Sequence, residues 1–92
     1  MMAAAIAEAP LTREQAAALA ALMDEARPTR PAGVVTAALL YEDGVATLVA
    51  CWASRDELDR YLEEVDVPRG VELMRRVGAE PTLRVVELLE LG

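Results

Sequence analysis

The chain has 92 residues, a net charge of −7 and 54% hydrophobic residues, and all nine of its basic residues are arginine. An acidic chain lacks the basic surface that nucleic acids require, so we exclude nucleic-acid binding, and the same charge disfavours binding to a membrane of anionic lipid. At this length, residues 1–92 are expected to form one domain that is only marginally stable on its own.

Few stabilising cross-links are available to so small a domain. Cys51 is the only cysteine, which excludes an internal disulfide, and the absence of histidine argues against a metal site. Self-association is the remaining source of stability. No segment reaches the roughly 18 apolar residues of a membrane span, and residues 1–10 lack the positive charge of a signal peptide. We therefore expect a cytoplasmic protein, and the arginine- and alanine-rich composition is typical of a GC-rich bacterial genome.

The first predicted elements are a strand and a helix. Residues 3–9 (AAAIAEA) form a short apolar run that ends at Pro10. Alanine favours a helix there, but a better helix start follows, so we predict a strand. Thr12 and Gln15 have the spacing of a capping box, and apolar residues then recur at helical spacing as far as Arg27. Pro28 ends this helix.

A hairpin and a final helical region complete the chain. Residues 34–41 and 45–53 are β-prone runs joined by Asp43-Gly44, a strong hairpin signal. Neither run alternates between apolar and polar residues, so we expect both faces of the hairpin to be buried. Ser54 and Glu57 suggest a second capping box, a break at residues 67–68 precedes another helical segment, and Gly78 suits its C-cap. Residues 82–91 are predicted as the last strand.

The resulting order, β-α-β-β-α-β, predicts an α+β, ferredoxin-like fold. Its four strands form an antiparallel sheet with both helical regions on one face. Nothing in the chain is left to cover the other, apolar face. We therefore predict a homodimer in which two sheets face each other as a dimeric α+β barrel, with an interface of about 2,000 Å² or more.

The junction between the hairpin and the second helix resembles a known family. Residues 50–62 (ACWASRDELDRYL) are similar to the corresponding junction of antibiotic-biosynthesis-monooxygenase-like domains, through Trp52, Ser54, Leu58 and Tyr61. The Gly-Ala-Glu-Pro run at 78–81 is also similar. The resemblance implies a homodimeric α+β barrel with a ligand pocket between sheet and helices. Some members of that family are cofactor-free oxygenases of aromatic polyketides or quinols, and others degrade haem, so the resemblance implies these two activities as candidates.

The chain departs from the residue sets that the resemblance implies. Haem-degrading members use a histidine at the position of Leu62, and the ring oxygenases use an asparagine at the position of Leu48. This chain contains neither histidine nor asparagine. Haem degradation is therefore not expected, and an oxygenase reaction here would need other residues.

Four residues are candidates for the ligand pocket. Trp52 suits either an aromatic pocket wall or a core position. Tyr41 and Tyr61 suit proton exchange with a phenolic ligand, although packing is the more common role. Arg84 suits binding of a carboxylate or enolate, or else a surface ion pair. The neighbouring Cys51 faces away from Trp52 and is expected to be a buried thiol.

The sequence lacks a phosphate-binding loop, a Ser-His-Asp set and a CxxC motif, so nucleotide-dependent, metal-dependent and hydrolytic chemistry are not expected. The leading hypothesis is a cofactor-independent monooxygenase-like protein of secondary metabolism that acts on an apolar, aromatic small molecule and needs no cofactor. A non-catalytic module that binds a small ligand or only dimerises is the alternative, and an O₂-independent polyketide cyclase is a third. No catalytic residue is assigned.

Overall fold

A computed structural model describes residues 1–92 and contains one four-stranded sheet. The strands are β1 (Met2–Pro10), β2 (Val34–Glu42), β3 (Val45–Trp52) and β4 (Thr82–Leu88). Their order in the sheet is β2-β3-β1-β4, and every neighbouring pair is antiparallel. The predicted α+β, ferredoxin-like topology is therefore confirmed.

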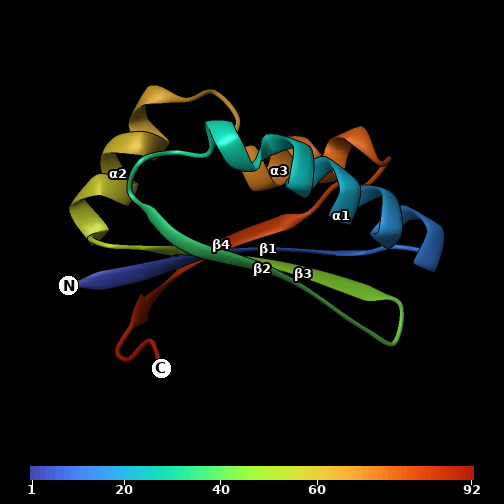
Figure 1. The fold of residues 1–92 in the computed structure, drawn as a ribbon, viewed down its shortest axis with the longest axis horizontal. Coiled ribbons are helices and arrows are strands. Elements are labelled where there is room, and N and C mark those ends of the chain that lie inside the picture. Colours follow the sequence, from blue (N-terminus) through green and yellow to red (C-terminus); the bar gives the residue numbers. More distant parts are fainter.

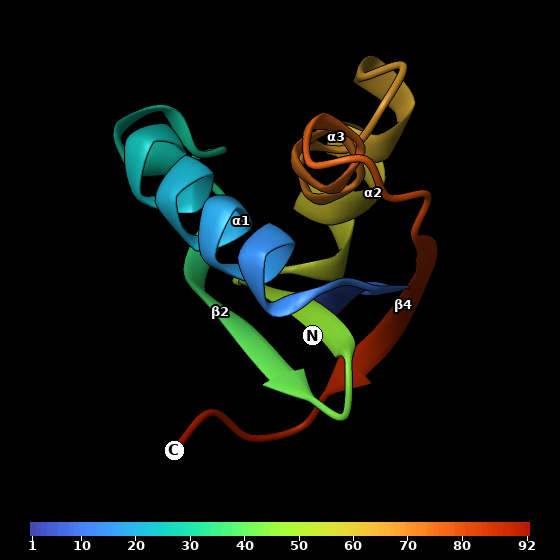
Figure 2. The ribbon, with the colours of Figure 1, turned by 90° about the vertical axis from the view of Figure 1, so that its right-hand side faces the viewer.

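Three helices cover one face of this sheet (Figure 1): α1 (Arg13–Ala26), α2 (Arg55–Glu64) and α3 (Arg69–Arg76). A short 3₁₀ turn, η1 (Arg27–Thr29), extends α1. Viewed along the sheet in Figure 2, α1 lies on one side, and α2 and α3 lie together on the other. None of the helices is both long and apolar enough to span a bilayer. The predicted break between the last two helices is confirmed, since α2 and α3 are separate elements.

The alanine-rich N-terminal segment is a strand, as predicted, despite its helix propensity. β1 lies between β3 and β4 at the centre of the sheet, and Ala3 and Ala7 are 0% and 2% exposed. Ala3 pairs with Trp52, and Ala7 pairs with Leu48. Tertiary pairing of this kind outweighs a preference of a few tenths of a kcal/mol per residue, about 0.7 at most.

The local signals at the ends of the elements are confirmed with one exception. Both bonds of the capping box between Thr12 and Gln15 form, at 3.1 and 2.8 Å. At α2 only half of the predicted box forms: the Ser54 hydroxyl accepts from the Glu57 amide at 3.1 Å, and the Glu57 carboxylate approaches that hydroxyl instead of the Ser54 amide. Gly44 turns the hairpin with φ 77°.

The end of α3 carries a surface ion pair. Gly78 adopts φ 91° after α3, and Arg75 and Glu80 meet across this turn at 2.7 Å. The hydrogen bond from Arg75 holds the pKa of the Glu80 carboxyl below its usual value, and both side chains are exposed. Exposed pairs contribute little to stability.

The last strand is shorter than predicted. β4 ends at Leu88, whereas the sequence suggested a strand as far as residue 91. Leu88 pairs with Met2, the first residue of β1, so no strand is available beyond it. Residues 89–92 leave the sheet and pass beneath its open face (Figure 2).

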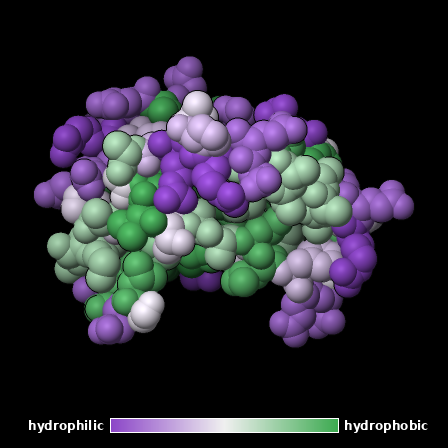
Figure 3. Space-filling model, viewed as in Figure 1, coloured by the Kyte–Doolittle hydropathy of each residue, from purple (hydrophilic) through white to green (hydrophobic).

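The face of the sheet that the helices leave open is apolar at its centre. The pairing register places the following apolar side chains on it: Met2, Ala4, Ile6, Ala38, Leu40, Val49, Cys51, Val86 and Leu88. Leu40 is 56% exposed, so this face of the hairpin is not fully covered within one chain, and its predicted burial depends on a partner. In Figure 3 hydrophobic atoms lie along the sheet layer, below the hydrophilic helical layer.

Candidate functional site

The core beneath the helices is divided into two clusters. The larger one lies around Leu19, Leu73 and Met74, where α1 and α3 pack on the sheet. The smaller one lies around Trp52 and Leu58, where α2 packs on the sheet. Side chains from both clusters line a cavity of about 120 Å³. The cavity therefore lies at the junction of the two clusters, between the sheet and the helices.

The floor of the cavity consists of small side chains. Ala5 and Ala7 of β1, Ala37 of β2 and Ala50 of β3 line it. Methyl groups do not reach across to the helical layer, so space remains where larger residues would fill it. Gly70 of α3 lines the same space, and a Cβ atom there would lie 3.4 Å from Leu48. The cavity is a direct consequence of this choice of small residues.

Trp52 forms one wall of the cavity and is itself packed in the core. Its side chain is 4% exposed, contacts the second cluster and lines the cavity. The ring centre lies 5.0 Å from that of Tyr61, with the planes inclined at 42°. The backbone of Gly33 lies against the indole, since a Cβ atom there would lie 2.7 Å from the ring. The sequence left open whether Trp52 faces a pocket or the helices, and in the structure Trp52 is buried in the core and also lines the cavity.

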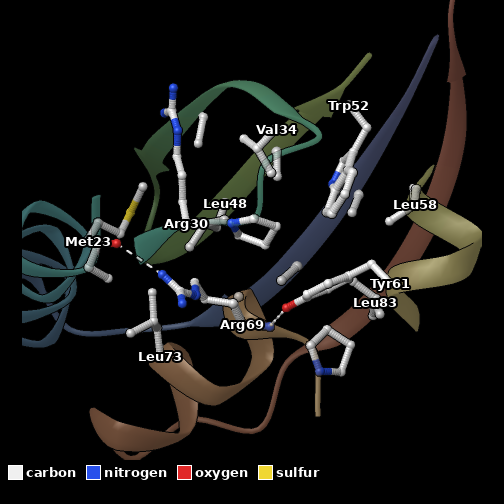
Figure 4. A pocket seen from close by; sticks show the side chains of 18 of the residues that line it. Met23, Arg30, Val34, Leu48, Trp52, Leu58, Tyr61, Arg69, Leu73 and Leu83 are labelled. Carbon is white, nitrogen blue, oxygen red and sulfur yellow. Dashed lines mark hydrogen bonds between the residues drawn. The ribbon is translucent and has the colours of Figure 1, made fainter. Parts of the chain in front are cut away.

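Tyr61 joins the cavity wall to the start of α3. Its hydroxyl oxygen accepts a hydrogen bond from the Arg69 amide at 2.9 Å (Figure 4). Pro68, the N-cap residue of α3, provides no side-chain cap, so Tyr61 takes that role. A phenol that accepts one hydrogen bond still has a proton to donate. No acceptor for that proton is present, which leaves it available to an oxygen atom of a bound molecule.

The other two candidates do not line this cavity. Tyr41 lies near the hairpin turn, where its hydroxyl donates to the Leu11 carbonyl at 2.8 Å and the Arg13 guanidinium lies over its ring. Arg84 pairs with Ile6 on the open face of the sheet and is exposed there. Cys51 is buried and faces away from Trp52, as predicted. No three His, Cys, Asp or Glu side chains lie close enough together to hold a metal ion.

Three arginines that sequence reasoning passed over line the cavity: Arg27, Arg30 and Arg69. Arg69 donates from Nη1 to the Ala26 carbonyl at 2.9 Å and to the Thr29 hydroxyl at 3.2 Å, which ties α3 to the end of α1. Each lies next to a proline at the end or start of a helical element: Arg27 precedes Pro28, Arg30 precedes Pro31, and Arg69 follows Pro68. The two helix ends, after α1 and before α3, can be predicted from the sequence. That they lie together over one cavity is seen only in the folded structure.

Replacing Tyr61 with phenylalanine is expected to lower the free energy of unfolding by about 1 kcal/mol, because the Arg69 amide loses its acceptor. Amide hydrogen exchange checks the cause, since the Arg69 amide should exchange faster in this variant. Tyr41→Phe is the matched control: it removes a comparable bond, to Leu11, outside the cavity. Equal exchange of the Arg69 amide in both variants would contradict the capping role.

Comparison with solved structures places the fold among known proteins. A Bordetella bronchiseptica protein classed as an antibiotic biosynthesis monooxygenase gives a TM-score of 0.69 at 21% identity, over 97% of this chain and 98% of that one. Rv0793 from Mycobacterium tuberculosis gives a TM-score of 0.63 at 24% identity, over 99% of this chain and 98% of that one. A third structure is an asparagine-to-alanine variant of SnoaB, a cofactor-independent oxygenase from Streptomyces nogalater. It gives a TM-score of 0.65 at 15% identity, over 98% of this chain and 95% of that one.

No family model and no curated protein sequence matches the chain. The likeness to these structures extends over nearly the whole chain and establishes the fold at identities below 25%. The chain thus has the fold of the antibiotic biosynthesis monooxygenases, as the resemblance at residues 50–62 predicted.

Proposed function

We propose that the chain is a cofactor-independent monooxygenase-like protein of secondary metabolism that acts on an apolar, aromatic substrate such as a quinol or a polyketide. The cavity carries this proposal. It combines an alanine floor, an aromatic wall of Trp52 and Tyr61, and an interior lined mainly by apolar side chains. A planar ring suits such a space, because aromatic groups pack well against an indole. The fold shared with a cofactor-independent oxygenase supports the same assignment.

The reaction that fits the cavity draws its electrons from the substrate. An electron-rich phenol or anthrone loses a proton to form a carbanion, which reduces O₂, and an anthrone methylene becomes a quinone carbonyl with release of water. The protein then has to orient the ring, exclude water and stabilise oxygen anions. The free proton of the Tyr61 hydroxyl is placed to donate to such an oxygen.

A non-catalytic ligand-binding module is the second candidate, and particular residues favour it. Leu48 and Leu62 line the cavity, and the resemblance implies asparagine and histidine at these positions in active members. A cavity without those polar groups still binds an apolar molecule. A polyketide cyclase uses the same cavity without O₂.

We also propose that two copies pair through the open face of the sheet, in the cytoplasm. The apolar residues around Ile6 and Val49 are covered only in part within the chain: Leu40 on the same face is 56% exposed. A second copy covers the same residues on both partners, which is the usual arrangement of a two-fold dimer.

Oxygen uptake with a panel of hydroquinones and anthrones tests the proposal, without added metal or flavin. We expect uptake by the native chain and its loss in Ala50→Leu, which fills the floor of the cavity. Ala20→Leu is the matched control, because Ala20 is exposed on α1. Turnover under nitrogen would assign a cyclase, and binding without turnover would assign the non-catalytic module. Equal uptake by Ala50→Leu and the native chain would place the reaction outside this cavity.

A further inference from the structure

The charged residues that line the cavity are all of one sign. The chain contains nine arginines and 16 acidic residues, yet three arginines and no acidic residue line this space. The local charge is therefore opposite to the net charge of −7. Cationic side chains beside a low-dielectric space attract an anion more strongly than the same charges do in water.

Two of these arginines have no carboxylate partner. Arg27 forms an ion pair with Asp24 at 2.9 Å. Arg30 donates only to the Val35 carbonyl, at a long 3.4 Å, and Arg69 donates only through Nη1 to neutral oxygens. A guanidinium carries five N–H groups, so both retain free donors. Two charged groups with spare donors beside one cavity are typical of a site for an anion.

The polar and aromatic parts of the lining lie on different sides. In Figure 4, Arg30 and Arg69 lie on one side of the cavity, and Trp52 and Tyr61 lie on the other. Arg30 is exposed, and its guanidinium points away from Arg69. Arg30 comes from the loop after η1, and Arg69 from the first turn of α3. A molecule that spans the cavity therefore meets the aromatic wall at one end and Arg69 at the other, and Arg30 can join Arg69 there by a change of its side-chain rotamer.

We propose that the ligand of this cavity is an aromatic carboxylate, whose ring lies against Trp52 and whose carboxylate binds Arg30 and Arg69. This inference rests on the proposed function only in taking the cavity as the ligand site. Arg69 is already held by the Ala26 carbonyl, so its free donors are fixed in place. Arg30 has only the weak bond to Val35 to give up when it turns toward the carboxylate.

The test compares 3-phenylpropanoate with its neutral isostere 3-phenylpropanamide. A single ring suits the cavity of about 120 Å³, since a cavity of about 150 Å³ accepts benzene. The chain has one tryptophan, so its NMR spectrum contains a single indole N–H signal, which belongs to Trp52. An NMR titration follows binding through the shift of this signal. We expect the acid to bind about tenfold more tightly than the amide. Arg30→Gln and Arg69→Gln should each weaken binding of the acid by about tenfold and leave the amide unchanged.

Arg76→Gln is the control, because Arg76 is exposed on α3 and does not line the cavity. It should leave the affinity for both probes unchanged. Arg30 makes only one long bond, so Arg30→Gln tests the proposal even if Arg69→Gln loosens the link between α1 and α3. Equal affinities for acid and amide, or an unchanged affinity in Arg30→Gln, would overturn the carboxylate site and leave the cavity as a ligand site. Failure of both probes to shift the indole signal would overturn the proposed function as well.

Discussion

Replacing Trp52 with alanine is expected to lower the free energy of unfolding by about 3–5 kcal/mol, the usual cost of removing a large aromatic side chain from a core. The indole is 4% exposed and connects Ala3, Leu58 and Tyr61, so its removal merges a new void with the existing cavity. In a domain of this size the midpoint of thermal unfolding should fall by more than about 12 °C. Urea denaturation and a thermal scan measure both quantities.

Trp52→Phe is the control for this loss. Phenylalanine keeps a ring between Leu58 and Tyr61, so its cost should be well below that of alanine. The affinity of the cavity for an aromatic ligand should decrease in the same order, from the native chain to Trp52→Phe and then to Trp52→Ala. A loss below about 1 kcal/mol in Trp52→Ala would show that the indole is not a core residue.

A glutamate at Val49 is expected to convert the proposed dimer into a monomer. Val49 lies between Ala38 and Ile6 at the centre of the open face, where the proposed partner sheet packs. Burial of unpaired carboxylates in that interface costs several kcal/mol, whereas in a monomer the same side chain reaches water. Light scattering after size exclusion should give twice the 9.9 kDa chain mass for the native protein and the single mass for Val49→Glu.

Ala17→Glu is the matched control, since it adds the same charge to the exposed side of α1. It should remain dimeric. A native chain that is monomeric at micromolar concentration would overturn the barrel, and a dimeric Val49→Glu variant would place the interface elsewhere.

Most of the fold is predictable from the sequence because local chemistry marks its boundaries. The Thr12 capping box, the Asp43-Gly44 turn and Gly78 each lie at an element end in the structure. The end of β4 is not encoded in this way, because residues 83–91 contain no glycine or proline that would mark the end of a strand. Its length is set by its pairing partner, since β1 begins at Met2. A strand's extent depends on a neighbour that is distant in sequence.

The candidate site is predictable only in part, for a similar reason. Trp52 and Tyr61 lie on one strand end and the helix that follows it, and the resemblance at residues 50–62 brought both into view. Arg84 is in β4, the strand whose Leu83 lines the cavity, but the pairing register turns the Arg84 side chain to the open face. Arg30 and Arg69 are 39 positions apart, and only the meeting of two helix breaks brings them to one cavity. Alternation along a strand fixes a face only once the register is known.

The alanine floor gives this domain an adjustable depth. The positions Ala5, Ala37 and Ala50 face the cavity from three different strands, and their backbone hydrogen bonds do not depend on the side chain. A larger side chain at any of them would reduce the depth of the cavity and leave the strand pairing in place. Single substitutions in the floor would therefore change the size of the molecule that fits, while the proposed dimer face on the reverse of the same strands stays unchanged. The proposed ligand site and the proposed dimer face thus lie on opposite sides of a single sheet.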